Sequence, residues 1–316
     1  MKSLLTVVIP IYNESENIFP LYDRLSKVLD EVSRKYQLKS EILFVNDGST
    51  DSSIDNIRLL HERDQRVKLL SFSRNFGHQI AITAGLDYSD GALVVVMDGD
   101  LQHPPELIPQ LIEQWQAGYE IVYTIRQDTA KASIAKRLTS RLFYKLLQFM
   151  SPVTIPEGSA DFRLMDRKTV EALNRLREKD RFLRGLIPWI GFRQIGVPYS
   201  ADKRHAGQSK YSTGKMLRLA VDGILSFSII PLRLSFFLGL VVSLSAFLYA
   251  LYALVVFATG RATPGWTSIL IVVLVLGGLQ MIVLGIVGEY IGRIYQEVKN
   301  RPIYIIRETL GLENNR

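Results

Sequence analysis

Two aspartates, one residue apart, follow an apolar run in the first third of the sequence, where Val94-Val95-Val96-Met97 leads into Asp98-Gly99-Asp100. Carboxylates this close repel each other, and a hard divalent cation that also bridges a diphosphate is the most economical counterion. The pattern therefore predicts a Mg²⁺ or Mn²⁺ site. A turn with two solvated aspartates is the alternative that so short a pattern leaves open.

Two other apolar runs also turn polar where they end. The first ends in Pro10-Ile11-Tyr12-Asn13-Glu14, and the second in Val45-Asn46-Asp47-Gly48-Ser49-Thr50. Asp47 could accept a hydrogen bond from a nucleotide base, and Gly48 would allow close approach of the backbone. Capping of the next helix is an alternative explanation for Asp47, Ser49 and Thr50.

These polar ends need a scaffold, and the sequence before residue 213 alternates β-rich runs with helical patterns. The predicted strands are Leu4–Ile9, Glu41–Val45, Val67–Ser71 and Ala92–Met97, and the predicted helices are Glu16–Tyr36, Ser53–Arg63 and His78–Tyr88. Such alternation predicts an α/β fold with a mostly parallel, Rossmann-like sheet wound by helices. Ligands bind beyond the carboxyl ends of the strands in such sheets, so the polar ends should meet there.

The last third of the chain contains two long stretches without charge, 234–260 and 262–288. Each is about 27 residues long, enough to cross a hydrocarbon core of about 30 Å. The connection around Arg261 is short, which predicts a transmembrane hairpin with helices at about 234–260 and 264–288. Lysines and arginines flank the hairpin on both sides, so the positive-inside rule predicts that both termini are cytoplasmic.

The composition leaves several classes of partner open. The net charge of +7 is compatible with nucleic acid, an anionic membrane or a phosphorylated substrate. Because the cations concentrate near the predicted membrane and diphosphate sites, we expect no nucleic acid partner. The chain has no cysteine, which excludes disulfides, thiolate nucleophiles and cysteine-ligated metals.

Two further stretches, Ala132–Met150 and Thr213–Ile230, carry basic residues among apolar ones at helical spacing, as interfacial helices do. Ordinary helices packed on the sheet are an equally good interpretation. The strand-like Ile303–Ile306 could pack on a neighbouring subunit, and homo-oligomerisation is left open. The predicted division is a catalytic domain over 1–212, a juxtamembrane amphipathic helix over 213–232, the hairpin over 233–292 and a tail over 293–316.

Taken together, Val8-Ile9-Pro10-Ile11-Tyr12-Asn13-Glu14, Asn46-Asp47-Gly48-Ser49-Thr50-Asp51 and Asp98-Gly99-Asp100-Leu101-Gln102-His103-Pro104 resemble glycosyltransferase family 2 with the GT-A fold. The resemblance is to its dolichyl-phosphate mannose synthase and bactoprenol glucosyltransferase branch. It spans roughly Leu4 to Lys215 and extends through the hairpin, which bacterial members of that branch also carry. One departure is Asn46, where many relatives have aspartate.

The resemblance implies roles for individual residues. It implies nucleotide-sugar binding by Pro10, Tyr12, Glu14, Asp47, Asp98, Gly99, Ser209 and Lys210, and metal binding by Asp98, Asp100 and Gln102. It implies lipid-phosphate binding by Arg126, Lys136, Arg137 and Ser140, and catalytic roles for Asp100, Asp161 and Arg204. Solvated surface charges remain an alternative for the basic residues, and a helix N-cap or an ion pair with Arg163 for Asp161.

The chain is therefore expected to be an enzyme of the inner membrane that transfers one sugar, glucose from UDP-glucose, to undecaprenyl phosphate with inversion. The acceptor phosphate is already ionised at pH 7, so Asp161 could orient rather than deprotonate it. Another donor, such as GDP-mannose or a UDP-aminoarabinose derivative, is the nearest alternative. A processive polysaccharide synthase lacks support because no Gln-x-x-Arg-Trp motif is present, and a non-catalytic membrane scaffold would not need the metal-side acids.

Overall fold

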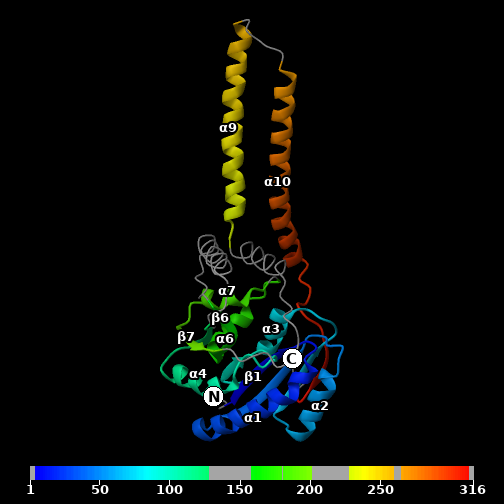
Figure 1. The fold of residues 1–316 in the computed structure, drawn as a ribbon, viewed down its shortest axis with the longest axis vertical. Helices are drawn as coiled ribbons and strands as arrows, with labels where there is room; N and C mark the ends of the chain where they lie inside the picture. Colours follow the sequence, from blue (N-terminus) through cyan, green and yellow to red (C-terminus); the bar gives the residue numbers. More distant parts are fainter. Residues whose placement is uncertain (1–3, 128–157, 180, 201–227, 260–264, 313–316) are drawn as a thin grey trace. The chain divides into compact units, whose positions relative to one another are not determined.

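The computed structural model describes residues 4–127, 158–179, 181–200, 228–259 and 265–312. These residues fall into two compact units. The first comprises the described residues before 201 together with 302–312, and the second comprises 228–259 and 265–301. Strands and helices alternate in the first unit, and two long helices form the second (Figure 1).

The elements of the first unit follow the predicted alternation. In chain order they are β1 (Leu4–Ile11), α1 (Ser15–Tyr36), β2 (Lys39–Asn46), α2 (Ser53–Arg63), β3 (Val67–Phe72), α3 (His78–Tyr88), β4 (Leu93–Val96), η1 (Pro105–Leu107), α4 (Ile108–Gln116), β5 (Ile121–Arg126), β6 (Ser159–Asp166), α6 (Arg167–Arg175), α7 (Leu183–Trp189), β7 (Gln194–Tyr199) and β8 (Ile306–Leu310). The four predicted strands and three predicted helices are all present.

The strands of the described residues form one sheet in the order β7-β5-β6-β4-β1-β2-β3-β8. Its centre, β4-β1-β2-β3, is parallel throughout, and β5 is parallel to β7. β6 runs antiparallel to both of its neighbours, and β8 runs antiparallel to β3. The prediction of an α/β fold with a mostly parallel sheet is confirmed. Its parallel centre brings the carboxyl ends of four consecutive strands to one edge.

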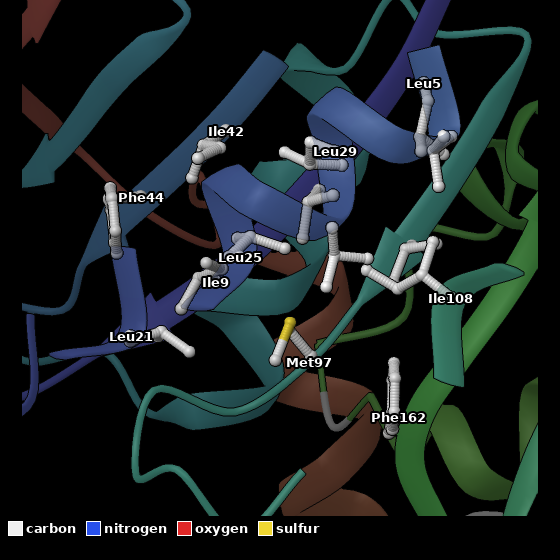
Figure 2. Close-up of a cluster of buried hydrophobic side chains, with 14 of the residues drawn as sticks. Leu5, Ile9, Leu21, Leu25, Leu29, Ile42, Phe44, Met97, Ile108 and Phe162 are labelled. Carbon is white, nitrogen blue, oxygen red and sulfur yellow. The ribbon is translucent and has the colours of Figure 1, made fainter. Parts of the chain in front are cut away.

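The core lies on both faces of this sheet because successive residues of a buried strand point to opposite sides. Leu21, Leu25 and Leu29 of α1, spaced by four residues, pack in one cluster with Ile9 of β1 and Phe44 of β2 (Figure 2). Their spacing places them on one face of the helix. All five side chains are fully or almost fully buried, so this cluster fixes α1 against the strands that carry the polar ends.

Helix α3 covers the opposite face of β1 and β2. Gly85 of α3 lies so close to β1 that a Cβ atom there would overlap the Val8 side chain. Because this contact holds α3 tightly against the parallel strands, the first residue of the helix, His78, is held beyond their carboxyl ends.

The C-terminal segment completes the edge of the sheet. β8 pairs with β3 of the same chain, and Arg58 donates two hydrogen bonds to Glu308, at 3.0 and 2.8 Å. Just before β8, the Tyr304 ring stacks on Phe72 with centroids 5.3 Å apart, and its hydroxyl donates to Asp87 at 2.9 Å. The strand therefore begins three residues later than the strand-like stretch in the sequence, and it packs on its own sheet.

Tyr304→Ala is expected to lower the free energy of unfolding of the first unit by about 2–3 kcal/mol, because it removes both ring burial and a hydrogen bond to a buried carboxylate. Tyr304→Phe keeps the ring and should lose only about 1 kcal/mol. Thermal unfolding of the purified protein measures both changes. Equal melting temperatures for all three proteins would show that the C-terminal segment does not stabilise the sheet.

The second unit consists of α9 (Ile230–Ala258) and α10 (Trp266–Val298). Both contain apolar windows long enough to cross a membrane, and no residue of these windows is buried within the structure. This agrees with the prediction of a membrane-anchoring hairpin. α10 extends ten residues beyond the predicted end, and this extension contains an ion pair of 3.2 Å between Arg293 and Glu289, one helical turn apart.

The predicted interfacial helix over 132–150 and nearly all of the one over 213–230 lie outside the described residues. The predicted boundary between catalytic domain and juxtamembrane helix, after residue 212, lies there as well. These boundaries stay predictions.

Candidate active site

The polar residues that follow β1, β2 and β4 are brought together at one edge of the sheet. The backbone N–H of Asp47, just after β2, donates to the carbonyl of Ile11 at 2.9 Å. The N–H of Met97, just after β4, donates to the carbonyl of Val8 at 3.1 Å. Parallel pairing thus continues past the regular strands, and it places the predicted nucleotide and metal residues at adjoining positions.

The loops after β1 and β2 are joined by side-chain hydrogen bonds. Asn13 donates its N–H to the Ser49 hydroxyl at 2.9 Å, and its side-chain oxygen accepts from the N–H of Thr50 at 2.8 Å. The N–H of Glu14 donates to the Ser53 hydroxyl at 3.1 Å. Ser49 and Thr50 therefore join these loops and do not cap α2, whose N-cap residue is Ser52.

The departure at Asn46 has a structural explanation. Its side chain is fully buried, its amide donates to the Ser71 hydroxyl of β3 at 2.9 Å, and its oxygen accepts from the N–H of Ser49 at 3.0 Å. An amide can donate and accept at the same time, whereas an ionised aspartate only accepts. Asn46 thus joins β2, β3 and the following loop without a buried charge.

Asp47 is almost fully buried, and its carboxylate receives hydrogen bonds from the turn that precedes α3. The N–H groups of Phe76 and Gly77 donate to it at 2.6 and 3.0 Å. Burial raises the pKa of Asp47, and these two donors oppose that rise. Asp47 therefore fixes the turn against the tip of β2, and its contact with a nucleotide base stays a prediction.

The same turn leads into His78, whose Nε2 lies 2.9 Å from Oδ1 of Asp98. Burial disfavours the charged imidazolium, but the hydrogen bond to Asp98 and the negative charges of Asp98 and Asp161 together outweigh this effect and raise the pKa of His78 to about 9. On the other side, the N–H of Asp98 donates to Nδ1 of His103, which is buried against Phe162 with ring centroids 5.3 Å apart. Asp98 is therefore held by two histidines for which the sequence predicted no role in the site.

The loop after β4 bends sharply at Leu101, which has a positive φ of 63° although it is not glycine. Such a conformation is strained for a branched apolar residue and occurs where surrounding contacts enforce it. The bend lets Oδ1 of Asp100 accept from the N–H of Gln102 at 3.1 Å. Gly99 lies against β1, where a Cβ atom would come 3.1 Å from the Ile11 side chain.

These acids fit a cation that is shared with a substrate. Within the described part of the chain, no group of three or more His, Asp or Glu side chains could hold a metal ion by itself. Asp98 and Asp100 supply hard carboxylate oxygens, and Mg²⁺ typically takes one or two carboxylates and completes its shell with water and phosphate oxygens. Gln102 is the weaker candidate ligand because its side-chain oxygen accepts from Arg126, at 3.5 Å.

Asp161 of β6 lies in a buried cluster of charges. Arg184 of α7 donates to both of its oxygens, at 3.0 and 2.9 Å, and Nη2 of Arg163 lies 3.3 Å from Oδ1. Burial would raise the pKa of Asp161, but the two guanidinium groups hold it well below its usual range. The carboxylate is therefore ionised at neutral pH and poorly suited to take up a proton. The ion pair with Arg163, one of the alternatives in the sequence, is present.

Ten of the predicted site residues are described by the structure: Pro10, Tyr12, Glu14, Asp47, Asp98, Gly99, Asp100, Gln102, Arg126 and Asp161. The others lie outside the described residues: Lys136, Arg137, Ser140, Arg204, Ser209 and Lys210. His78, His103 and Arg184 were missed. His78 begins α3 six residues after the end of β3, whereas Asp98 comes two residues after β4, so the rule of polar strand ends did not reach it. No local signal marks Arg184.

Comparison with known proteins identifies the two parts of the chain. Residues 6–173 match the family described as Glycosyl transferase family 2, and residues 230–294 match the GtrB C-terminal hairpin. A protein of Bacillus subtilis named "Uncharacterized glycosyltransferase YkcC" is 47% identical over 98% of this chain and 95% of its own length. The "Bactoprenol glucosyl transferase" of Shigella phage SfII is 42% identical over 96% of this chain and 98% of its own length.

Among solved structures, glucosyl-3-phosphoglycerate synthase from Mycobacterium tuberculosis in complex with Mn²⁺, UDP-glucose and phosphoglyceric acid matches with a TM-score of 0.47 and 18% identity. The match covers 70% of this chain and 77% of that one.

Proposed function

Because the chain belongs to glycosyl transferase family 2 and carries a GtrB-type C-terminal hairpin, we propose that it transfers one glucose from UDP-glucose to undecaprenyl phosphate. One observation carries this proposal. The relatives named bactoprenol glucosyl transferase match at 42% identity over 96% of the chain, hairpin included. A shared anchor matters because the acceptor is a lipid that the catalytic unit must meet at a membrane surface.

The donor would bind along the strand ends that carry Tyr12, Glu14, Asp47 and Asp98. When bound, a divalent cation would offset the charge of the diphosphate, and Asp98 and Asp100 would hold it there. Ser209, Lys210 and Arg204, named from the family resemblance, would add positive and polar contacts to the leaving UDP.

The acceptor phosphate would approach past Arg126, together with Lys136, Arg137 and Ser140. One of its oxygens would attack the anomeric carbon as the bond from that carbon to the UDP oxygen breaks, so that UDP leaves with the electron pair. A single displacement of this kind inverts the anomeric configuration. The phosphate oxygen is already ionised at neutral pH, so the step needs positioning and charge stabilisation and not a strong base.

Lysines and arginines flank the apolar part of the hairpin on both sides: Arg233 lies in the first turn of α9, and Arg293, Lys299 and Arg301 follow the apolar part of α10. By the positive-inside rule, both flanks would lie in the cytoplasm of a bacterial inner membrane. The enzyme would then use cytoplasmic UDP-glucose and leave the glucose on a lipid at that face.

The direct test incubates purified protein with undecaprenyl phosphate, Mg²⁺ or Mn²⁺ and, separately, UDP-glucose, UDP-galactose, UDP-N-acetylglucosamine, a UDP-aminoarabinose derivative and GDP-mannose. Mass spectrometry follows the lipid. A chelator-sensitive product with UDP-glucose alone supports the proposal, and a product with another donor alone corrects the sugar. Folded protein that yields no product with any donor contradicts the proposal.

The contact between His78 and Asp98 leads to a prediction for this assay. His78→Ala is expected to lower the rate of transfer about tenfold, because Asp98 loses the partner that fixes its carboxylate. His78→Gln can still donate to Asp98 and should retain most of the activity. His61→Ala, a change to a histidine of α2, is the matched control, and an equal loss in that variant would argue for a general effect on folding.

A further inference from the structure

The three charged side chains of the cluster around Asp161, namely Asp161, Arg163 and Arg184, differ in how much of their surface is exposed to solvent. The side chains of Asp161 and Arg163 are only 9% and 6% exposed, whereas that of Arg184 is 31% exposed. Arg163 also donates to the carbonyls of Ala160 and Asp161, which are part of its own strand. Arg163 is thus built into the interior, and Arg184 is the member of the cluster that presents surface to the outside.

Arg184 belongs to the same site as the predicted substrate residues. Its charge and those of Arg126, Asp98 and Asp100 all act on the hydroxyl of Tyr199, although burial is the main reason why the pKa of Tyr199 is raised. Its charge also acts on His78, the partner of Asp98. The contacts agree with this placement: Arg126 donates to Gln102, and the ring of Phe162, the residue after Asp161, stacks on His103, which accepts from the N–H of Asp98.

The contact between Arg184 and Asp161 is of a kind that orients a guanidinium group. Nε and Nη2 of Arg184 donate to the two carboxylate oxygens in the parallel arrangement that a planar fork favours. A guanidinium has five N–H donors, so one group can hold a carboxylate on one edge and another anion on a second edge. Because Asp161 is buried and ionised, it fixes the direction in which the exposed part of Arg184 points.

From this geometry we propose that Arg184 binds a phosphate oxygen of a substrate and that Asp161 is the residue that positions it. The inference rests on the proposed function, which brings a phosphate monoester next to a nucleoside diphosphate. Two anionic groups in one site need several cations to offset their repulsion, and guanidinium is suited to phosphate. The phosphate could belong to either substrate, so the test separates the two sources.

The test compares the wild-type full-length protein with Arg184→Gln and Arg184→Lys. Arg177→Gln is the matched control. Arg177 also forms an ion pair with a buried carboxylate, that of Asp87, at 2.8 Å, but it is not one of the site residues. Isothermal titration calorimetry in detergent measures binding of UDP with Mn²⁺ in one arm and of a short-chain, water-soluble polyprenyl phosphate in the other. Neither arm requires turnover, and thermal unfolding reports whether each variant is folded.

We expect Arg184→Gln to weaken one of the two bindings by about tenfold or more, which is the loss of one charge-assisted hydrogen bond. Arg184→Lys should weaken the same binding to a lesser degree, and Arg177→Gln should change neither. Weakened UDP binding assigns Arg184 to the donor diphosphate, and weakened polyprenyl phosphate binding assigns it to the acceptor.

Both bindings within about twofold of wild type in a folded Arg184→Gln protein would overturn the inference and leave Arg184 as a counterion of Asp161. If the glutamine variant does not fold, unchanged binding in Arg184→Lys has the same meaning. Wild-type protein that binds neither ligand would instead contradict the proposed function, so the two failures are distinguishable.

Discussion

Replacement of Asp100 by asparagine is expected to lower the rate of sugar transfer by about three orders of magnitude. Asp100 follows β4 in a loop bent by the strained Leu101, and its carboxylate is aligned by the N–H of Gln102 at 3.1 Å. Asparagine has nearly the same shape but no charge, so it would weaken the hold on a cation bound with the diphosphate. The leaving UDP would then carry its negative charge without compensation.

The measurement is the initial rate of glycolipid formation at saturating Mg²⁺ or Mn²⁺, together with a melting curve. Asp90→Asn is the matched control, because Asp90 is an exposed aspartate just before the same strand, at its other end. An Asp100→Asn protein that folds and turns over at the wild-type rate would contradict the assignment of Asp100 to the metal.

Asp161→Asn is expected to lower both stability and transfer. It would remove the negative charge that faces the buried Arg163 and the partly exposed Arg184, and breaking a buried ion pair such as that of Asp161 with Arg163 costs about 3–5 kcal/mol. Transfer by the protein that remains folded should fall about a hundredfold, because Arg184 would lose its orientation.

The effect on stability should depend on pH in a defined direction. The pKa of Asp161 is depressed in the folded state, so its contribution is present above the unfolded value of 3.8 and is lost as the pH falls below it. The difference in stability between the wild-type protein and Asp161→Asn should therefore shrink as the pH falls below this value. Asp87→Asn, which changes a buried aspartate paired with Arg177 and Tyr304, is the control. It should lower the melting temperature and leave the rate of the folded enzyme unchanged, and an equal loss of rate would argue against a role of Asp161 in the site.

Much of the fold follows from local features of the sequence. The parallel strands are buried on both faces, so they appear as apolar runs such as Val94-Val95-Val96, and the rule that ligands bind at their carboxyl ends located Asp47, Asp98 and Asp100. The hairpin could also be predicted from the sequence, because a helix that crosses a bilayer must be long and uncharged whatever other helices it packs against.

The side-chain contacts inside the site could not be predicted from the sequence in the same way. His78 and Asp98 are 20 residues apart and Asp161 and Arg184 are 23 apart, so only the folded chain brings them into contact. In the sequence, Asn46 stands where many relatives have an aspartate, and its role could not be predicted. In the structure its amide forms two hydrogen bonds that an ionised aspartate could not both make. Similarly, nothing in the tail indicated that β8 would pair with β3, because the partner of an edge strand is set by tertiary packing.

The most direct test of the central claim is the release of UDP from UDP-glucose by purified protein, measured with and without undecaprenyl phosphate. We expect UDP to appear only when the lipid phosphate is present, with one UDP formed for each molecule of monoglucosylated lipid. UDP release that is independent of the lipid, or a lipid that carries a growing chain of sugars, would contradict transfer of a single glucose to a polyprenyl phosphate.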